Sequence, residues 1–305
     1  STNYRSGDLI IRSSSRLAGN LRSRFRKNFS GDRQVDGTIR FLRKQNEDKE
    51  DQGIFDKIME KLNSNALKSV AILGRTHEVL SDIATKLASR GIPIILKGGA
   101  QAFSTYEERQ LLSALAISSN IKQEHFWGLK VSTDLYGFSK RIKDDPWKIK
   151  IKSLSTFILN RIAGSISDET ILNIHSQVDK TIKILDEASD AKSFFSKLSD
   201  SLKKVNSEDA VFIGTIHSAK GLEWKTVFIK GFEEDLIPHW RSFSPKDLEE
   251  ERRLLYVGIT RAKDELILSL ANFRNNDPTE VSRFFPELGL RRATDLTRSE
   301  WTPPK

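Results

Sequence analysis

The chain has 305 residues, 37% of them hydrophobic and 30% charged, which is enough for roughly two globular domains with buried cores. It contains no cysteine, which excludes disulfides and thiolate metal sites and fits a reducing compartment such as the cytoplasm. No apolar run approaches the roughly 20 residues that cross a bilayer, and no secretory pattern opens the chain. We therefore expect a cytoplasmic protein with no membrane partner.

The net charge of +9 indicates a polyanionic partner, with nucleic acid the first candidate. Basic residues are concentrated in positions 1–40, which hold nine Arg and Lys against three Asp. A solvated basic helix face explains this run equally well. The chain does not begin with Met, so we expect that it was cut from a longer protein.

Strand and helix patterns alternate from residue 38 to residue 99. Short apolar runs at 38–43, 69–74 and 92–96 predict strands, and apolar residues recur at helical spacing over 49–65 and 76–91. Gly91 is expected to cap the second helix at its carboxyl end. This β-α-β-α-β order predicts a parallel sheet covered by helices.

The pattern changes to helices over residues 100–209, where apolar stripes such as Leu111, Leu112 and Leu115 recur. Strands are then predicted at 210–215, 226–231 and 265–271, with helices at 248–257 and 278–288. The expected architecture is one α/β domain, 1–99 and 210–290, split by a helical insertion at 100–209 and followed by a tail at 291–305. The insertion's large aromatic residues are expected in its core rather than in a base-stacking surface: Trp127, Tyr136, Phe138 and Trp147.

Four stretches occur in a fixed order: TNYRS (2–6), VAILGRTHEVLSDIATKLASRGIPIILKGG (70–99), GTIHSAKGLEWKTVFIKGFEEDLIP (214–238) and EEERRLLYVGITRAKDEL (249–266). Together they resemble the UvrD/Rep/PcrA family of superfamily-one DNA helicases, and TIHSAKGLEW and YVGITRA are the most specific parts. In that family two RecA-like motor domains clamp ATP between them. The resemblance implies that this chain is the second motor domain, a RecA-like parallel sheet with helices on both faces, carrying its inserted subdomain.

A Gly-x-x-x-x-Gly-Lys-Ser/Thr phosphate loop should lie in the first motor domain. None of the 17 glycines here is followed by Lys, so this chain has no such loop. The resemblance therefore implies that ATP and Mg²⁺ are bound jointly with a first motor domain that this chain lacks. The Mg²⁺ ligands would not belong to this chain, for which we predict no metal site.

The resemblance assigns four residues to the nucleotide. Arg261 resembles the arginine finger and Arg5 a second γ-phosphate sensor, and these are the predicted catalytic residues. Tyr4 would stack on the adenine and Glu223 would accept a ribose hydroxyl. The alternatives are a structural salt bridge from Arg261 to Glu250 or Glu251, a frayed terminus at Tyr4 and Arg5, and a local backbone contact for Glu223.

Six residues are assigned to single-stranded DNA: Arg75, Thr76, His77, Thr215, His217 and Ser218. Each trio follows a predicted strand, where open α/β sheets place ligands, and hydroxyl and imidazole groups suit phosphate contacts. Helix capping by Thr76 and local hydrogen bonding by His217 are the alternatives. Phe273 and Arg274 could stack on a base, and at most one of Arg252 and Arg253 can face the nucleotide.

The resulting hypothesis is the C-terminal part of an ATP-dependent helicase that translocates 3′ to 5′ along single-stranded DNA toward a duplex junction. Such a chain is expected to be inactive alone, because the phosphate-loop domain is absent. The alternative is a non-catalytic nucleic-acid or partner-binding module that keeps the helicase fold.

Overall fold

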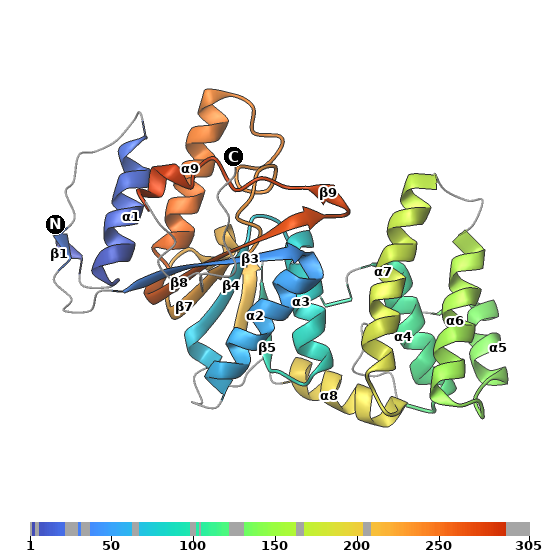
Figure 1. The fold of residues 1–305 in the computed structure, drawn as a ribbon. Coiled ribbons are helices and arrows are strands. Elements are labelled where there is room, and N and C mark those ends of the chain that lie inside the picture. The colour runs from blue at the N-terminus through green and yellow to red at the C-terminus, as the bar shows by residue number, and fades with distance from the viewer. Residues whose placement is uncertain are drawn as a thin grey trace. The chain divides into compact units, whose positions relative to one another are not determined.

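The computed structural model describes residues 2–3, 6–21, 30–31, 37–62, 67–97, 102–103, 105–121, 131–162, 168–203 and 209–290. The chain forms two compact units (Figure 1). The first comprises Ser1–Ala84, Ile95–Ala100 and Ser207–Lys305, and the second comprises Thr85–Ile94 and Gln101–Asn206.

A seven-stranded sheet forms the centre of the first unit, with the order β3-β8-β7-β4-β6-β5 and with β9 paired to β8. Its strands are β3 (Thr38–Asn46), β4 (Val70–Gly74), β5 (Ile94–Lys97), β6 (Val211–Thr215), β7 (Trp224–Ile229), β8 (Ala262–Arg274) and β9 (Asp277–Pro278). The β3–β8, β8–β7, β7–β4 and β4–β6 pairs are parallel, and only the short β9 is antiparallel to its described partner. Separately, β1 (Thr2–Asn3) pairs in parallel with β2 (Ser30–Gly31).

Helices cover both faces of this sheet (Figure 1). On one face α1 (Asp8–Gly19) and α9 (Pro245–Ile259) share a core cluster with alternate β8 side chains, Leu266, Leu268 and Leu270. On the other face lie α2 (Glu47–Leu62) and α3 (Glu78–Ser89), although the last residues of α3 belong to the second unit. Because helices cover both faces of the sheet, successive side chains of the central strands are all buried, and these strands read as continuous apolar runs. The predicted α/β class, with a parallel sheet and helices on both faces, is confirmed.

The described elements of the second unit are helical: α4 (Tyr106–Ser118), α5 (Thr133–Arg141), α6 (Trp147–Ile162), α7 (Asp168–Asp186) and α8 (Ala191–Lys203). α4 packs against the other four and buries its predicted stripe of Leu111, Leu112 and Leu115 completely. It begins with a reciprocal Thr105–Glu108 capping box, and buried Glu108 also accepts the Thr181 hydroxyl at 2.7 Å. A capped helix that is buried over most of its length explains how a segment without strands forms its own core.

Three expectations about local structure need correction. The predicted helix at 278–288 is wrong apart from a 3-10 turn at Pro286–Leu288, because the backbone at 280–282 bonds to residues 232–234 and only turns follow it. Helix α1 was not predicted, since its polar serines hide the buried Ile10, Ile11 and Leu17. Tyr136 is exposed rather than part of a core, whereas Phe138 stacks on Phe157 and Trp127 lies outside the described residues.

Candidate nucleotide and nucleic-acid sites

Two of the predicted nucleotide residues lie side by side where β7 and β8 begin. Trp224 and Ala262 are register partners, and the Trp224 N–H donates to the Arg261 carbonyl at 2.9 Å. Glu223 and Arg261 each precede one of these strands, so both lie at the amino-terminal edge of the sheet. The Lys263 ammonium lies 2.7 Å from a Glu223 carboxylate oxygen, so Glu223 is held as one partner of an ion pair.

The segment that follows Arg5 reaches the same edge. Buried Ser6 donates its hydroxyl to the Ala262 carbonyl at 2.7 Å, and the Gly7 N–H donates to the Lys263 carbonyl at 2.8 Å. The predicted nucleotide residues Tyr4 and Arg5 are thus followed directly by two residues that are fixed beside Arg261. Tyr4 and Arg5 themselves lie outside the described residues.

Arg261 is oriented by neutral acceptors. Its Nε donates to the Val257 carbonyl at 3.0 Å, and its two terminal nitrogens donate to the Leu222 carbonyl at 3.0 Å and the Thr260 hydroxyl at 3.1 Å. The first and last of these groups belong to the carboxyl end of α9, whose final carbonyls need donors. These three bonds fix the direction of the guanidinium.

Glu250 and Glu251 do not form the structural salt bridge that was the alternative for Arg261. Glu250 pairs with Arg253 on the same helix, and Glu251 binds Arg75.

The six predicted DNA residues lie at the opposite, carboxyl-terminal edge of the sheet. Gly74, the last residue of β4, is the register partner of Thr215, the last residue of β6, so the two trios start side by side. Thr215 caps the 3-10 helix η3 (Ile216–Ala219) by accepting the Ser218 N–H at 3.4 Å, and the Ser218 hydroxyl donates to the Thr215 carbonyl at 2.7 Å. His77 and His217 are exposed.

Two glycines allow this edge to form. A Cβ on Gly214 would lie 2.6 Å from the Ser218 hydroxyl, and a Cβ on Gly74 would lie 2.6 Å from a Val79 methyl. Both separations are shorter than side chains tolerate, so glycine is required as the last residue of β4 and as the residue before the last in β6. The loops that follow can therefore fold back closely over the strand ends.

Arg75 is paired with a nearly buried carboxylate. Its guanidinium binds Glu251 of α9 with two nitrogens, at 2.8 and 3.0 Å, and the His239 N–H donates to the same carboxylate at 3.1 Å. Burial lowers the pKa of His239 below its ordinary value, and the charge of Arg75 is the second largest cause of this shift. His239 is therefore neutral at pH 7.

Helix α9 connects the two edges. Glu251 near its start holds Arg75 at the carboxyl edge, while Val257 and Thr260 at its end hold Arg261 at the amino edge. Ten residues of helix span about 15 Å, close to the length of these strands. The 215–223 segment makes the same crossing, from the Thr215 cap to the Leu222 carbonyl on Arg261.

The other arginines that we considered form ion pairs with carboxylates. Arg252 binds Glu287 and Arg253 binds Glu249 and Glu250, so each is paired by acidic residues. The suggestion that Arg274 stacks on a base is wrong, because its guanidinium is bonded to the buried carboxylates of Glu50 and Glu233. Phe273 beside it is 45% exposed.

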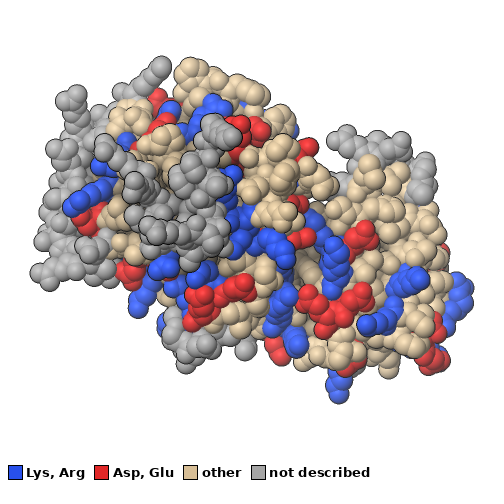
Figure 2. Space-filling view, in the orientation of Figure 1, with Lys and Arg blue, Asp and Glu red and all other residues tan. Residues whose placement is uncertain are grey.

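The described arginines of the basic stretch at 1–40 also have partners. Arg12 pairs with Asp8, Arg16 donates to the Gly289 carbonyl at 2.7 Å, and Arg40 lies 3.2 Å from Glu265. The remaining basic residues of the stretch, Arg5, Arg22, Arg24, Arg26, Lys27 and Arg33, lie outside the described residues. On the face drawn in Figure 2, Lys and Arg side chains are interspersed with Asp and Glu.

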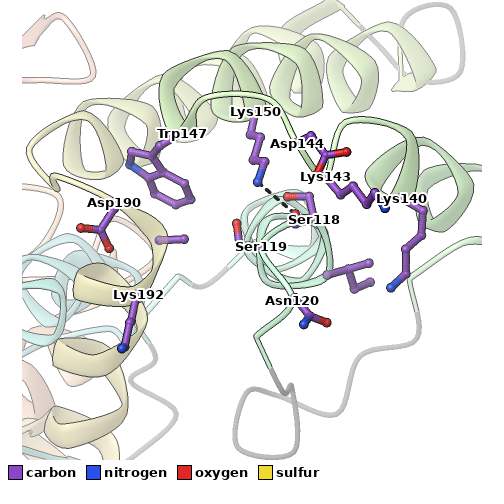
Figure 3. A pocket seen from close by; sticks show the side chains of 12 residues that line it. Ser118, Ser119, Asn120, Lys140, Lys143, Asp144, Trp147, Lys150, Asp190 and Lys192 are labelled. Carbon is purple, nitrogen blue, oxygen red and sulfur yellow. Dashed lines mark hydrogen bonds between the residues drawn. The ribbon is translucent and has the colours of Figure 1, made fainter.

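The second unit contains a hollow of about 770 Å³ between the ends of its helices (Figure 3). Trp147 and four lysines line it, and none of the predicted site residues does. The nearly buried Lys150 donates to the Ser118 carbonyl at 3.0 Å, which neutralises the carboxyl end of α4.

Among the described residues, no helix is long and apolar enough to cross a membrane, and no group of three acidic or histidine side chains could hold a metal ion.

The sequence-based prediction missed the second half of the loop at 230–244, beyond the resembling stretch that ends at Pro238. It carries His239, whose backbone shares the Glu251 carboxylate with Arg75, and the exposed aromatic residues Trp240 and Phe243. The loop has neither helical nor strand periodicity, so its only sequence signal was two aromatic residues three positions apart in a polar stretch.

Comparison with known proteins gives a family for this arrangement. The family described as UvrD-like helicase C-terminal domain matches residues 1–145 and 167–273. The ATP-dependent DNA helicase PcrA of Bacillus subtilis (strain 168) is 26% identical, with 94% of this chain and 48% of the relative covered. The ATP-dependent DNA helicase Rep of Buchnera aphidicola subsp. Schizaphis graminum is 27% identical, with 94% and 55% covered.

Among solved structures, the C-terminal domain of a possible DNA helicase from Lactobacillus plantarum WCFS1 aligns over 94% of this chain and 92% of its own, with 14% identity and a TM-score of 0.42. The chain spans about half the length of the PcrA and Rep relatives. The family assignment rests on the sequence match, which covers most of both units. The chain belongs to the UvrD-like helicase C-terminal domain family.

Proposed function

We propose that this chain is the second, RecA-like motor domain of an ATP-dependent DNA helicase that moves 3′ to 5′ along single-stranded DNA. The observation that carries the proposal is the crossing of α9 and the 215–223 segment from one sheet edge to the other. Both connect the Arg261 guanidinium with the loops at 75–77 and 215–218. A motor needs such a connection, because nucleotide contacts must change the grip on DNA.

At the amino edge, Arg261 would stabilise the charge that develops on the γ-phosphate of an ATP molecule held by a first motor domain. An arginine supplied in this way contributes about 10³–10⁵ in rate in well-studied nucleotide hydrolases. Glu223 would bind the ribose, and Arg5 and Tyr4 would contact the γ-phosphate and the adenine. Mg²⁺ would neutralise phosphate charge when bound, through ligands supplied by the first motor domain.

At the carboxyl edge, the trios at 75–77 and 215–218 would contact the backbone of single-stranded DNA. The Arg75–Glu251 pair favours a positioning role for Arg75, since that guanidinium is already bonded to a carboxylate. Exposed His77 and His217 are better placed to reach a phosphate. We also expect that parts of the longer protein other than these loops contact the duplex junction.

The test is Arg261→Ala in the longer protein that contains this chain. ATP turnover in the presence of single-stranded DNA should fall by about 10³-fold or more. Binding of the same DNA at fixed salt should change less than about two-fold, because the substitution lies at the other sheet edge. This chain alone should hydrolyse no ATP.

Turnover by this chain alone that survives Arg261→Ala would contradict the proposal. The alternative, a non-catalytic binding module, predicts no DNA-stimulated turnover in the longer protein and no effect of Arg261→Ala on it.

A further inference from the structure

The loop between β7 and α9 presents two large aromatic side chains to solvent. Trp240 is 51% exposed and Phe243 is 79% exposed, three residues apart. Single exposed apolar residues are common on protein surfaces and need no function. The surroundings of this pair decide what it does.

The loop is fixed in shape. Phe232 and Ile237 anchor it in the core of the first unit, with exposures of 0% and 1%. The Trp240 N–H donates to the Asp235 carbonyl at 2.9 Å, and a Ser244–Asp247 capping box starts α9 directly after Phe243. The exposure of the aromatic pair therefore belongs to an ordered surface that exists before any ligand binds.

The loop adjoins the candidate DNA edge. The His239 N–H and the Arg75 guanidinium bind the same Glu251 carboxylate, which links the residue before Trp240 to the trio at 75–77. The His239 and Trp240 rings lie 5.8 Å apart, 31° from parallel. The His239 Nδ1 accepts the Arg241 N–H at 3.3 Å, so that nitrogen carries no proton. His239 thus adds an aromatic surface here and not a charge.

A cation accompanies the indole. The Arg241 guanidinium carbon lies 4.7 Å from the centre of the Trp240 ring, within cation–π range. No carboxylate among the described residues pairs with Arg241. An aromatic face beside a guanidinium with no acidic partner in the described part of the chain offers one surface for a base and one donor for a phosphate.

We propose that Trp240, supported by Arg241 and Phe243, is a base-stacking platform that extends the single-stranded DNA path beyond the loops at 75–77 and 215–218. This proposal rests on the proposed function, because it needs DNA at the carboxyl edge. It identifies the contacted chemistry as the face of an unpaired nucleobase. Stacking on an aromatic side chain is tolerant of sequence, so no base preference is implied.

The test separates bases from backbone. The full chain is titrated at fixed low salt with fluorescently labelled oligothymidylate and with an abasic phosphodiester oligomer of the same length. The wild type should bind oligothymidylate roughly ten-fold more tightly than the abasic oligomer, a ratio within the range of single aromatic–base contacts. Trp240→Ala should reduce that ratio to about two or less while abasic binding stays unchanged.

Two controls keep the result interpretable. Trp240→Phe retains an aromatic face and should keep most of the ratio, and Tyr106→Ala removes a residue of similar exposure, 54%, and should keep all of it. Thermal unfolding should be unchanged in each variant, because these side chains are half exposed.

The other outcomes are decisive. If the wild type prefers oligothymidylate and Trp240→Ala preserves the preference, the platform is refuted while the proposed function stands. Equal binding of both oligomers by the wild type refutes any base contact, and a protein-docking role for the pair then becomes the better explanation. If the wild type binds neither oligomer, the DNA edge in the proposed function fails and the platform fails with it.

Discussion

The two edges of the sheet in the first unit hold their arginines in different ways. At the carboxyl edge, Arg75 and Arg274 are bonded to the carboxylates of Glu251, Glu50 and Glu233, which are 0–5% exposed. At the amino edge, Arg261 donates to two backbone carbonyls and a hydroxyl. A guanidinium bonded to buried carboxylates belongs to the framework, whereas these three acceptors orient the Arg261 guanidinium without themselves carrying a charge.

The carboxyl edge also contains an unusual concentration of buried charge. Besides Arg274 it includes the ion pair of Lys230 and Asp51, 2.5 Å apart and 2% and 1% exposed. Burial of Glu50 alone would raise its pKa, but the charges of Lys230 and Arg274 and the Ser269 hydrogen bond together lower it. Substitutions at this edge should therefore change stability first, and substitutions at the amino edge should change turnover first.

The largest stability effect is expected from Arg274→Met. The substitution leaves two buried carboxylates without the cation that binds both, which should lower the free energy of unfolding by about 3–5 kcal/mol. Chemical denaturation measures it. Arg253→Met is the matched control, because Arg253 pairs with acids on the helix surface and should lose under about 1 kcal/mol. Equal losses in the two variants would remove the distinction between framework and surface pairs.

The next effect is a pH dependence at Asp51. Burial raises the pKa of Asp51 to about 6 from an ordinary 3.8, despite the opposing charge of Lys230. Between these values the folded chain keeps a proton that the unfolded chain has released, so this group's stabilisation is complete below about pH 4 and is lost as pH rises through 6. The loss is up to about 3 kcal/mol, at about 1.4 kcal/mol per pKa unit.

Denaturant titrations of wild type and Asp51→Asn from pH 4 to pH 7 isolate that contribution. The wild type should lose stability relative to the variant as pH rises, since the asparagine does not titrate and Lys230 stays charged in both. A difference between the two proteins that is constant over this range would show that Asp51 titrates normally.

A smaller effect is expected at the Arg75–Glu251 pair, which joins the carboxyl edge to α9. Arg75→Met should cost about 2 kcal/mol, because Glu251 keeps the His239 N–H but loses its cation. Glu251→Gln should cost a similar amount, and the double variant less than the sum of the two. Strict additivity in this double-mutant cycle would mean that the pair contributes no coupling.

These side chains show what the sequence could and could not predict. The short β-branched run at 69–74 and the helical spacing over 49–65 predicted a strand and a helix, observed at Val70–Gly74 and Glu47–Leu62, because their burial follows from neighbouring residues. Glu50 and Arg274 are 224 residues apart, so no local pattern could indicate their bond. The motif resemblance selected Arg261 and Glu223, which do lie together, but gave no signal for Trp240 because its loop has no periodicity. The wrong helix at 278–288 contains an interior Pro286, which disfavours a helix, and its pairing with 232–234 through Glu233 and Val281 is a contact that no local pattern indicates.

The smallest stability effect and the largest functional effect should coincide at Arg261. Arg261→Ala removes three hydrogen bonds to neutral, partly exposed acceptors that water can replace, so the free energy of unfolding should fall by only about 1 kcal/mol. The same change should reduce DNA-stimulated ATP turnover of the longer protein by about 10³-fold or more. Measuring both on one preparation, with Arg261→Lys to keep the charge but lose the planar donors, distinguishes a phosphate contact from a helix cap. A cap predicts that turnover falls only in proportion to stability, and such a result would place Arg261 in the framework with Arg75 and Arg274.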